Sequence, residues 1–363
     1  MKPKIGVVIH GPEVIDSGGA RMVLDALSEH YDAIAMLGGT MGRTAVLDHF
    51  LEDRIDISKR MGPSETINSL SWTDAVILLN RGKSIESGIA FGRIVLSRSK
   101  RVPVVQIEHP MENGVVIPWN DALAWAESIA DILNLQVKPA PPAQDIQVVR
   151  TENGLAHRRI HDVRSGETIR VGGIVVGTAV SDDVEIIVDD GRIVDITGVR
   201  VKEHGIEKLG RINIEKVVIR TGSIRRTNYA PRIGVTDRQV GSQLRVVLID
   251  HNAESSFELA ADADLAVTVG DDTTAIAGDI LYRLGIPVIG ITDMDLDYVL
   301  RDTSILPGSA VLRVEPGYDD IVGNMVHDMI FGGKNYTMVQ SIESIREQVV
   351  EIARERLIEV MSY

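Results

Sequence analysis

The first 136 residues alternate short apolar runs with amphipathic segments, and this alternation is the feature that most narrows the folds open to the chain. Four apolar runs of five or six residues predict buried strands, with helices between them. Strands that are buried on both faces and joined by helices form a parallel sheet. We therefore predict an N-terminal α/β domain, Rossmann-like, over residues 1–137. Its predicted strands are Ile5–Ile9, Ala33–Leu37, Ala75–Leu79 and Val102–Ile107.

The pattern changes after a proline-rich stretch at 138–145, KPAPPAQD, which cannot continue a helix and is interpreted as a stiff linker. Residues 146–240 carry short β-branched runs separated by glycine-containing turns. Asp190-Gly191 stands between two alternating runs, which is a strong hairpin signal. Because no convincing helix pattern occurs in this stretch, we predict a small all-β domain, either a barrel or a sandwich.

Apolar runs separated by helical patterns return after residue 240 and predict a second α/β domain over 241–335. Its predicted strands are Leu244–Ile249, Leu265–Val269, Val288–Ile291 and Val311–Val314. The remaining residues, 336–363, are predicted to hold a long amphipathic helix at Ser341–Val360. Its apolar stripe would pack on its own domain or on a second subunit, so a homodimer through this helix is one expected assembly.

The charge is unevenly spread along the 363 residues. The whole chain carries −14, but residues 196–245 hold eleven Lys/Arg against four acids, a balance of +7. A basic segment can bind nucleic acid, yet this one contains a single aromatic residue, Tyr229, whereas stacking platforms need several. Charge complementarity between domains is therefore the preferred interpretation, with nucleic acid as the less favoured partner.

Composition removes several other classes of protein. The chain has no cysteine, so it can hold neither an iron–sulfur cluster nor a thiolate zinc site. No 18-residue apolar stretch occurs, and the apolar run before His10 is too short for a signal-peptide core. These features predict a cytoplasmic protein without a membrane partner.

Two glycine-containing loops follow predicted strands of the first domain, at the sheet edge where ligands of parallel sheets bind. Glycine lets backbone amides approach an anion closely, and the cations and hydroxyls of these loops would add to the attraction. We predict that the loops hold a phosphate, although a tight turn with a helix cap would give the same pattern. Neither loop has the glycine spacing of a Walker motif. The predicted ligand-binding residues are Gly38, Gly39, Thr40, Gly42, Arg43, Thr44, Arg81, Lys83 and Ser84.

Histidines and carboxylates follow the other strands of the same domain. His10 with Glu13, and His109 with Glu108, would border the same crevice. Histidine titrates near neutral pH, so His10 and His109 are candidate acid–base residues. A capping or packing role is the alternative for each of them.

Acidic residues gather after the predicted strands of the second α/β domain. Carboxylates at one sheet edge repel one another unless a cation neutralises them, and hard oxygen ligands favour Mg²⁺ or Mn²⁺. The alternative is that these acids cap helices or face the basic β segment. The predicted metal ligands are Asp250, Asp271, Asp272, Asp293 and Asp295, and His251 is a third candidate acid–base residue.

Two partial resemblances lie in this domain. The run Leu265–Asp297 is similar to the Toprim arrangement of metal-dependent nucleic-acid enzymes, but Gly270-Asp271-Asp272 stands where those proteins carry Glu-Gly. Asp250-His251-Asn252 is similar to a motif of the DHH phosphoesterases, whose other aspartate motifs are not found in the expected order. Both resemblances imply metal and phosphate.

The chain as a whole resembles an uncharacterised conserved protein family of methanogenic archaea. The phrases that carry this resemblance are VVIHGPEVIDSG, LGGTMGRTAV, KEHGIEKLG and VGDDTTAIAGDILYRLGIPVIGITDMDLD. Membership implies a cytoplasmic archaeal protein and no particular activity.

These observations lead to one preferred hypothesis and one alternative from another class. The preferred hypothesis is a protein that binds a phosphate-bearing small molecule, for which a nucleotide is a candidate, with Mg²⁺ between the first and third domains. Phosphoryl or nucleotidyl transfer would be its chemistry. The alternative is a non-catalytic protein that senses a ligand or takes part in an assembly.

Overall fold

The computed structural model describes residues 2–141, 149–160, 163–221, 232, 243–293 and 304–363. The chain divides into two compact units, residues 1–230 and 231–363, and each is described by itself. Across these described ranges, none of the helices combines the length and the apolar composition needed to cross a membrane. The five predicted domain ranges stay predictions, and parts of the linker and of the second boundary lie outside the described residues.

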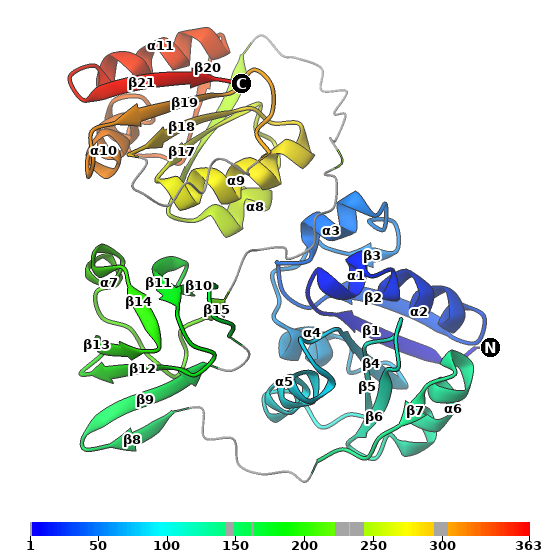
Figure 1. Ribbon diagram of the computed structural model, residues 1–363. Helices are drawn as coiled ribbons and strands as arrows, with labels where there is room; N and C mark the ends of the chain where they lie inside the picture. Colours follow the sequence, from blue (N-terminus) through cyan, green and yellow to red (C-terminus); the bar gives the residue numbers. More distant parts are fainter. Residues whose placement is uncertain (1, 142–148, 161–162, 222–231, 233–242, 294–303) are drawn as a thin grey trace. The chain divides into compact units, whose positions relative to one another are not determined.

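The N-terminal part of the first unit is built on a seven-stranded sheet with the order β3-β2-β1-β4-β5-β6-β7 (Figure 1). Strands β1 to β5 are mutually parallel, and β6 runs antiparallel to β5. Its elements are β1 (Lys4–Ile9), α1 (Glu13–Asp16), α2 (Gly19–Ser28), β2 (Asp32–Leu37), α3 (Arg43–Asp48), β3 (Ile55–Asp56), α4 (Pro63–Ser69), β4 (Ala75–Asn80), α5 (Ile85–Ser97), β5 (Val104–Glu108), β6 (Val115–Trp119), α6 (Leu123–Leu133) and β7 (Gln136–Val137).

Burial explains why these segments are strands. All six residues of β4 and all five of β5 are buried, as expected for parallel strands that are covered on both faces. One apolar core packs α2 and α6 against the sheet, and a second core packs α4 and α5 against the opposite face. The predicted parallel α/β sheet is confirmed.

The strand order creates a switch point between β1 and β4. From β1 the chain adds strands on one side, through β2 and β3, and from β4 it adds strands on the other side. The helices after β1 and β4 therefore leave toward opposite faces, and a crevice opens beyond the carboxyl ends of these two strands. Ligands of doubly wound sheets bind in such a crevice.

The rest of the first unit holds two four-stranded sheets around one apolar core, with the orders β14-β11-β10-β15 and β13-β12-β9-β8. The predicted hairpin at Asp190-Gly191 is confirmed, since both residues have positive φ and the flanking strands pair antiparallel. The elements are β8 (Arg150–Glu152), β9 (Leu155–Ile160), β10 (Thr168–Val171), β11 (Ile174–Ala179), β12 (Val184–Asp189), β13 (Arg192–Thr197), β14 (Val199–Val201), α7 (Glu203–Leu209) and β15 (Ile219–Thr221).

The expectation of an all-β segment is wrong in one place, because α7 is a helix. Its side chains Ile206 and Leu209 pack against the core of the two sheets. Gly205 lets the helix approach β11 closely, since a Cβ atom there would lie 1.9 Å from the Val175 carbonyl oxygen. The two turns of helix are too short for their apolar spacing to stand out in the sequence.

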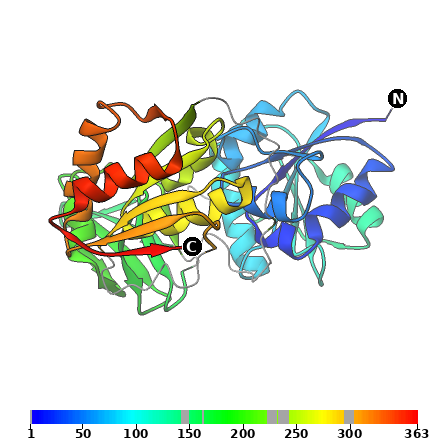
Figure 2. The same cartoon turned by 90° about the horizontal axis from the view of Figure 1, so that it is seen from above.

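The second unit contains a six-stranded sheet with the order β20-β16-β17-β18-β19-β21. The four predicted strands are confirmed as β16 to β19, which run parallel. Figures 1 and 2 show α11 across this sheet, where α10 and α11 share one core, and α8 and α9 pack in a core on the other face. The elements are β16 (Leu244–Asp250), the 3₁₀ turn η1 (Ala253–Ser255), α8 (Ser256–Leu259), β17 (Leu265–Val269), α9 (Asp271–Leu284), β18 (Val288–Thr292), β19 (Ala310–Val314), α10 (Asp319–Met329), β20 (Tyr336–Val339), α11 (Ile342–Ala353) and β21 (Leu357–Ser362).

The prediction of one helix from Ser341 to Val360 is wrong at its C-terminal end. The helix α11 ends at Ala353, and the chain continues into β21, which pairs antiparallel with β19. Leu357 happens to continue the helical apolar spacing, but edge pairing with β19 satisfies the backbone of this segment instead. Because Ile345 and Val349 are buried in the core of this unit, the apolar face of α11 packs on its own sheet. A homodimer through this helix stays a prediction.

Candidate functional site

A pocket of about 530 Å³ lies at the switch point of the N-terminal sheet. We call it the α5 pocket, because one face of α5 forms a wall of it. The ends of β1 and β4 supply another wall, and residues of β9 and β15 in the same unit complete the lining. The lining residues are His10, Gly11, Glu13, Asn80, Arg81, Gly82, Lys83, Ser87, Ala90, Phe91, Ile94, Arg98, Arg158, Arg159, Ile160 and Ile219.

His10 enters this pocket from the end of β1. Its ring packs edge-on against Phe91, with 4.2 Å between centroids and 78° between planes. Nδ1 is buried without a hydrogen-bond partner among the described residues, and His10 is one of the residues that line the pocket. Burial lowers the pKa of His10 from 6.5 to about 4, so the imidazole is neutral at pH 7 and can accept a proton or a hydrogen bond.

The shifted pKa of His10 predicts a pH dependence of stability. Between about pH 6.5 and about pH 4, His10 is protonated in the unfolded chain and neutral in the folded protein. Acidification therefore favours unfolding in this pH range. Between pH 7 and pH 5 this group alone is expected to cost about 2 kcal/mol. Urea unfolding at a series of pH values should show that His10→Gln loses this much of the wild-type pH dependence. The exposed His30, replaced by glutamine, is the control, and equal pH profiles for His10→Gln and wild type would contradict the prediction.

The loop after β4 leads into α5 through a side-chain cap. Ser84 is the N-cap residue, and its Oγ accepts a hydrogen bond from the Ser87 backbone N–H. The Ser87 hydroxyl in turn accepts a hydrogen bond from the Ser84 backbone N–H and donates one to the Ser84 carbonyl oxygen. Ser84, predicted to bind the ligand, is therefore placed as a helix cap.

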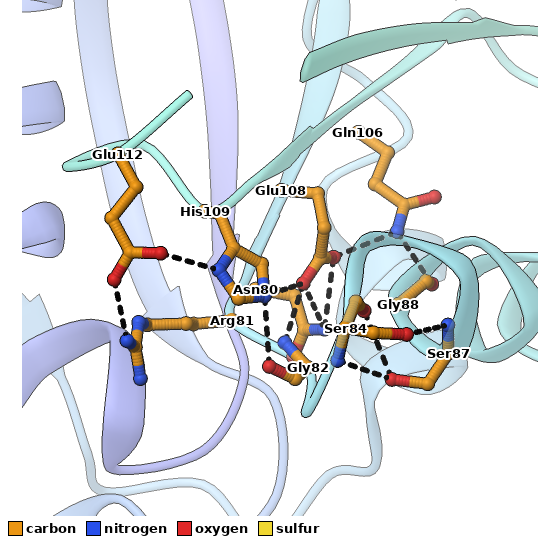
Figure 3. A network of polar contacts seen from close by, with 10 residues as sticks. All are labelled: Asn80, Arg81, Gly82, Ser84, Ser87, Gly88, Gln106, Glu108, His109 and Glu112. Atoms are coloured by element: carbon orange, nitrogen blue, oxygen red, sulfur yellow. Dashed lines mark hydrogen bonds and ion pairs between the residues drawn. The ribbon is translucent and has the colours of Figure 1, made fainter. Parts of the chain in front are cut away.

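A buried carboxylate holds the same loop in place (Figure 3). Glu108 is fully buried at the end of β5 and accepts hydrogen bonds from Asn80 Nδ2, from the Gly82 backbone N–H and from Gln106 Nε2. Gln106 is oriented in turn, because its Oε1 accepts from Trp119 Nε1 and its Nε2 donates to the Gly88 carbonyl oxygen. Burial raises the pKa of Glu108, and the three hydrogen bonds oppose that shift. The network fixes the position of residues 80–82, which line the pocket.

Two glycines allow α5 to cover this network. A Cβ atom at Gly88 would lie 2.1 Å from Glu108 Cδ, and one at Gly92 would lie 2.0 Å from Gln106 Oε1. The glycines are four residues apart on one face of α5, and the two polar side chains are two residues apart on one face of β5. Backbone therefore packs directly against buried polar groups at this contact.

His109 stands on the other side of the loop, with a positive φ of 55°. Its Nε2 lies 2.8 Å from the Gly82 carbonyl oxygen, so Nε2 carries the hydrogen and donates it. Its Nδ1 lies 3.3 Å from Glu112 Oε2. Both ring nitrogens are thus occupied by loop contacts, and the structure places His109 as a support of residues 80–82 rather than in the pocket lining.

The two predicted cations of the loop line the pocket but are paired with carboxylates. Arg81 Nη2 lies 2.7 Å from Glu112 Oε1, and Lys83 Nζ lies 3.1 Å from Glu167 Oε2. Their charges are therefore already compensated. An anion in the pocket would have to share or replace these partners.

Arg98 and Arg158 are the pocket cations that no carboxylate of the described residues compensates. Arg158 donates through Nη1 to the carbonyl oxygens of Ile214 and Val217, at 2.6 and 2.8 Å. Burial lowers the pKa of Arg158, and the positive charge of Arg98 lowers it further, because the two guanidinium groups repel each other. Arg98 is exposed and Arg158 is half-buried, and an anion bound beside both would relieve the repulsion between their like charges. Arg98 and Arg158 therefore give the pocket its uncompensated positive charge among the described residues.

The first predicted phosphate loop does not reach this pocket, whose lining includes none of residues 38–44. Arg43 is buried and donates to the Lys59 carbonyl oxygen at 3.2 Å, and Thr44 is buried beside it in α3. Gly38 and Gly42 make close packing contacts, while Gly39 has a positive φ of 105°. The structure therefore does not bring the predicted cations together, and the role predicted for Gly38, Gly39, Thr40, Gly42, Arg43 and Thr44 stays a prediction.

The carboxyl ends of β16, β17 and β18 carry the predicted acidic residues of the second unit that the structure describes. His251 lies between two carboxylates, since its Nδ1 contacts Asp250 Oδ1 and its Nε2 lies 3.3 Å from Asp320 Oδ1. Asp293 Oδ2 accepts a hydrogen bond from the Gly317 backbone N–H at 2.7 Å. These contacts connect the end of β16 and the end of β18 to the segment that begins α10.

The remaining acids of this edge belong to a helix start. Asp271 and Asp272 occupy the first turn of α9, where negative charge is favoured by the helix dipole. In the part of the chain that the structure describes, no group of three or more His, Cys, Asp or Glu side chains is placed to hold a metal ion. The predicted Mg²⁺ or Mn²⁺ site therefore finds no support here. Asp295 lies outside the described residues, as does the end of the run similar to Toprim, so that resemblance stays a prediction.

The sequence did not predict the aromatic residue and the two uncompensated cations of the pocket lining. Phe91, Arg98 and Arg158 carry no motif, and Arg98 and Arg158 are sixty positions apart in the chain. One local signal was available: the glycines at 88 and 92 on a predicted helix, followed by the alternating polar residues of VVQIEHP. Much of the basic segment 196–245 lies outside the described residues, and its nucleic-acid partner stays untested.

Comparison with known proteins connects residues 7–334 to a family described as "Uncharacterized protein conserved in archaea (DUF2117)". A protein of Methanocaldococcus jannaschii, described as "Uncharacterized protein MJ0065", is 40% identical over 353 residues, which cover 95% of this chain and 96% of the relative. The matched residues include the α5 pocket, and the two chains share nearly their whole length. The resemblance seen in the sequence is confirmed.

Proposed function

The chain belongs to this archaeal family, and we propose that its function is to bind a phosphate-bearing small molecule in the α5 pocket. The observation that carries the proposal is the pair Arg98 and Arg158, two guanidinium groups in one pocket without a compensating carboxylate among the described residues. Arginine forks match the oxygen pairs of phosphate, which makes an oxyanion the natural neutralising ligand.

The position of the pocket supports the same function. It lies at the carboxyl ends of β1 and β4, at the switch point where doubly wound sheets bind their ligands. The network around Glu108 fixes the loop at this edge before any ligand arrives. A rigid, positively charged crevice of this volume suits a small molecule better than a protein surface.

Ligand binding is common to the enzyme hypothesis and to the ligand-sensing form of the alternative. A phosphoryl-transfer enzyme and a ligand-sensing protein would each need this pocket. His10, which is neutral at pH 7 and lines the pocket, is the acid–base candidate in the enzyme case. No metal ion is assigned a part in this proposal.

Thermal unfolding with inorganic pyrophosphate tests the proposal. A ligand at a hundredfold over its Kd stabilises the fold by about 2.7 kcal/mol, which raises Tm by a few degrees. We expect Arg98→Gln to weaken pyrophosphate binding by roughly tenfold to a hundredfold, because it removes a charged hydrogen-bond donor. Arg98 is the better variant than Arg158, whose contacts with two backbone carbonyls also support the fold.

Arg93→Gln is the matched control, since Arg93 lies on α5, the helix that Arg98 caps, and outside the pocket lining. It should bind pyrophosphate as the wild type does. A Tm that no phosphate compound raises, or an equal shift in wild type and Arg98→Gln, would refute the proposal.

A further inference from the structure

The α5 pocket has an apolar stretch between its polar ends, and this stretch specifies what kind of phosphate compound fits. Ser87, Phe91 and Ile94 lie on α5, and Arg98 is its C-cap residue. The four follow one another at spacings of four, three and four residues, so they share one side of the helix. Phe91 and Ile94 are half-buried there, and Ala90, Ile160 and Ile219 are further apolar residues of the lining. A free phosphate ion would use none of this apolar surface.

An aromatic corner marks one end of the apolar stretch. The rings of Phe91 and His10 meet at 78°, and both residues line the pocket. The neutral His10 ring behaves here as a second aromatic surface, and its Nδ1 has no hydrogen-bond partner among the described residues. Two ring planes at a right angle suit a flat group that stacks on one ring and meets the edge of the other.

The cationic pair marks the other end. Arg98 follows Phe91 by seven residues, which on a helix corresponds to about 10 Å along the axis. A ligand that reaches both ends must therefore carry an anion at one end, a planar ring at the other and a spacer between them. A nucleoside monophosphate has these three parts in this order: phosphate, ribose and base.

We infer that the α5 pocket takes a nucleoside monophosphate, with the phosphate between Arg98 and Arg158 and the base against Phe91. The inference rests on the proposed function, since it names the class of compound for the same pocket. The base adds stacking to the attraction of the phosphate, and stacking on one aromatic side chain is worth roughly tenfold or more in affinity.

Calorimetric titration of the full-length chain with AMP, UMP and ribose 5-phosphate tests this inference. All three carry the same phosphate ester, and the last lacks the base. We expect both nucleotides to bind wild type roughly tenfold or more tightly than ribose 5-phosphate. Phe91→Leu, which keeps an apolar side chain at this position, should lose that preference and bind the nucleotides and ribose 5-phosphate with similar affinity.

The outcomes separate the inference from the proposed function. If ribose 5-phosphate and the nucleotides bind equally, and Arg98→Gln binds all three more weakly, the inference of a nucleoside monophosphate is wrong and the proposal of phosphate binding stands. If the nucleotides bind more tightly but Phe91→Leu keeps the preference, the base does not lie against Phe91 and the inference is also wrong. If none of the three compounds binds, or if Arg98→Gln binds them as the wild type does, both proposals fail.

Discussion

Replacing Gly88 by alanine is expected to destabilise the protein by about 3 kcal/mol, a large effect for the addition of one methyl group. The new Cβ atom would lie 2.1 Å from the Glu108 carboxyl carbon and 2.3 Å from Oε2, so either α5 or the carboxylate must move. Both sides of this contact are buried, and the carboxylate is tied to three donors, so neither can move freely. Urea unfolding measures the loss as a lower transition midpoint.

Gly62→Ala is the control for this substitution. Gly62 has a negative φ, −66°, and a Cβ atom there would meet only Glu65 Oε2 at 3.7 Å. The same change of residue should therefore alter stability by less than about 1 kcal/mol. Equal midpoints for Gly88→Ala and Gly62→Ala would show that α5 does not pack on Glu108 as described.

Replacing Glu108 by alanine is expected to cost about 3 kcal/mol as well, for a different reason. The substitution leaves the Asn80 amide, the Gly82 backbone N–H and one Gln106 hydrogen without their acceptor in a buried site. Each unpaired buried donor costs about 1–3 kcal/mol, and relaxation of the loop recovers part of the sum. The loop that lines the α5 pocket would lose its support, so pyrophosphate binding should weaken along with stability.

Glu112→Ala is the matched control, because Glu112 is an exposed carboxylate that contacts the same loop through Arg81 and His109. Its removal should change stability by less than about 1 kcal/mol. A third variant tests the ionisation of Glu108. Because the pKa of Glu108 is raised in the folded protein, the wild type loses stability as the pH rises above 4.5. Glu108→Gln has no carboxyl group to ionise at this position. The difference in free energy of unfolding between wild type and Glu108→Gln should therefore shrink as the pH rises. A loss in Glu108→Ala no larger than that in Glu112→Ala would contradict the role assigned to the buried network.

The strands of both parallel sheets could be predicted because their residues are apolar on both faces. Ala75–Asn80 is buried along its whole length, and a run of this kind has few alternatives to a central strand. The end of the C-terminal helix could not be predicted in this way. Leu357 fits the helical spacing, and only its pairing partner β19, more than forty residues earlier, makes the segment a strand.

The candidate site, too, could be predicted only in part from the sequence. The sequence placed Arg81 and Lys83 at the correct sheet edge, because the rule for carboxyl ends of parallel strands needs only the strand positions. It could not show that each is paired with a carboxylate, since Glu112 and Glu167 are brought near by folding alone. Arg98 and Arg158 line one pocket for the same reason, and neither stands in a recognisable motif. Arg43 looked like a ligand-binding cation, but it is buried inside its own domain.

The central claim concerns where a phosphate compound binds, and a crystal structure of the chain grown with AMP tests it most directly. We expect electron density for the phosphate within hydrogen-bond distance of the Arg98 and Arg158 guanidinium groups, and density for the base beside Phe91. Density for the phosphate at the Gly38–Thr44 loop, or at the acidic edge of the second unit, with the α5 pocket empty, would contradict the claim.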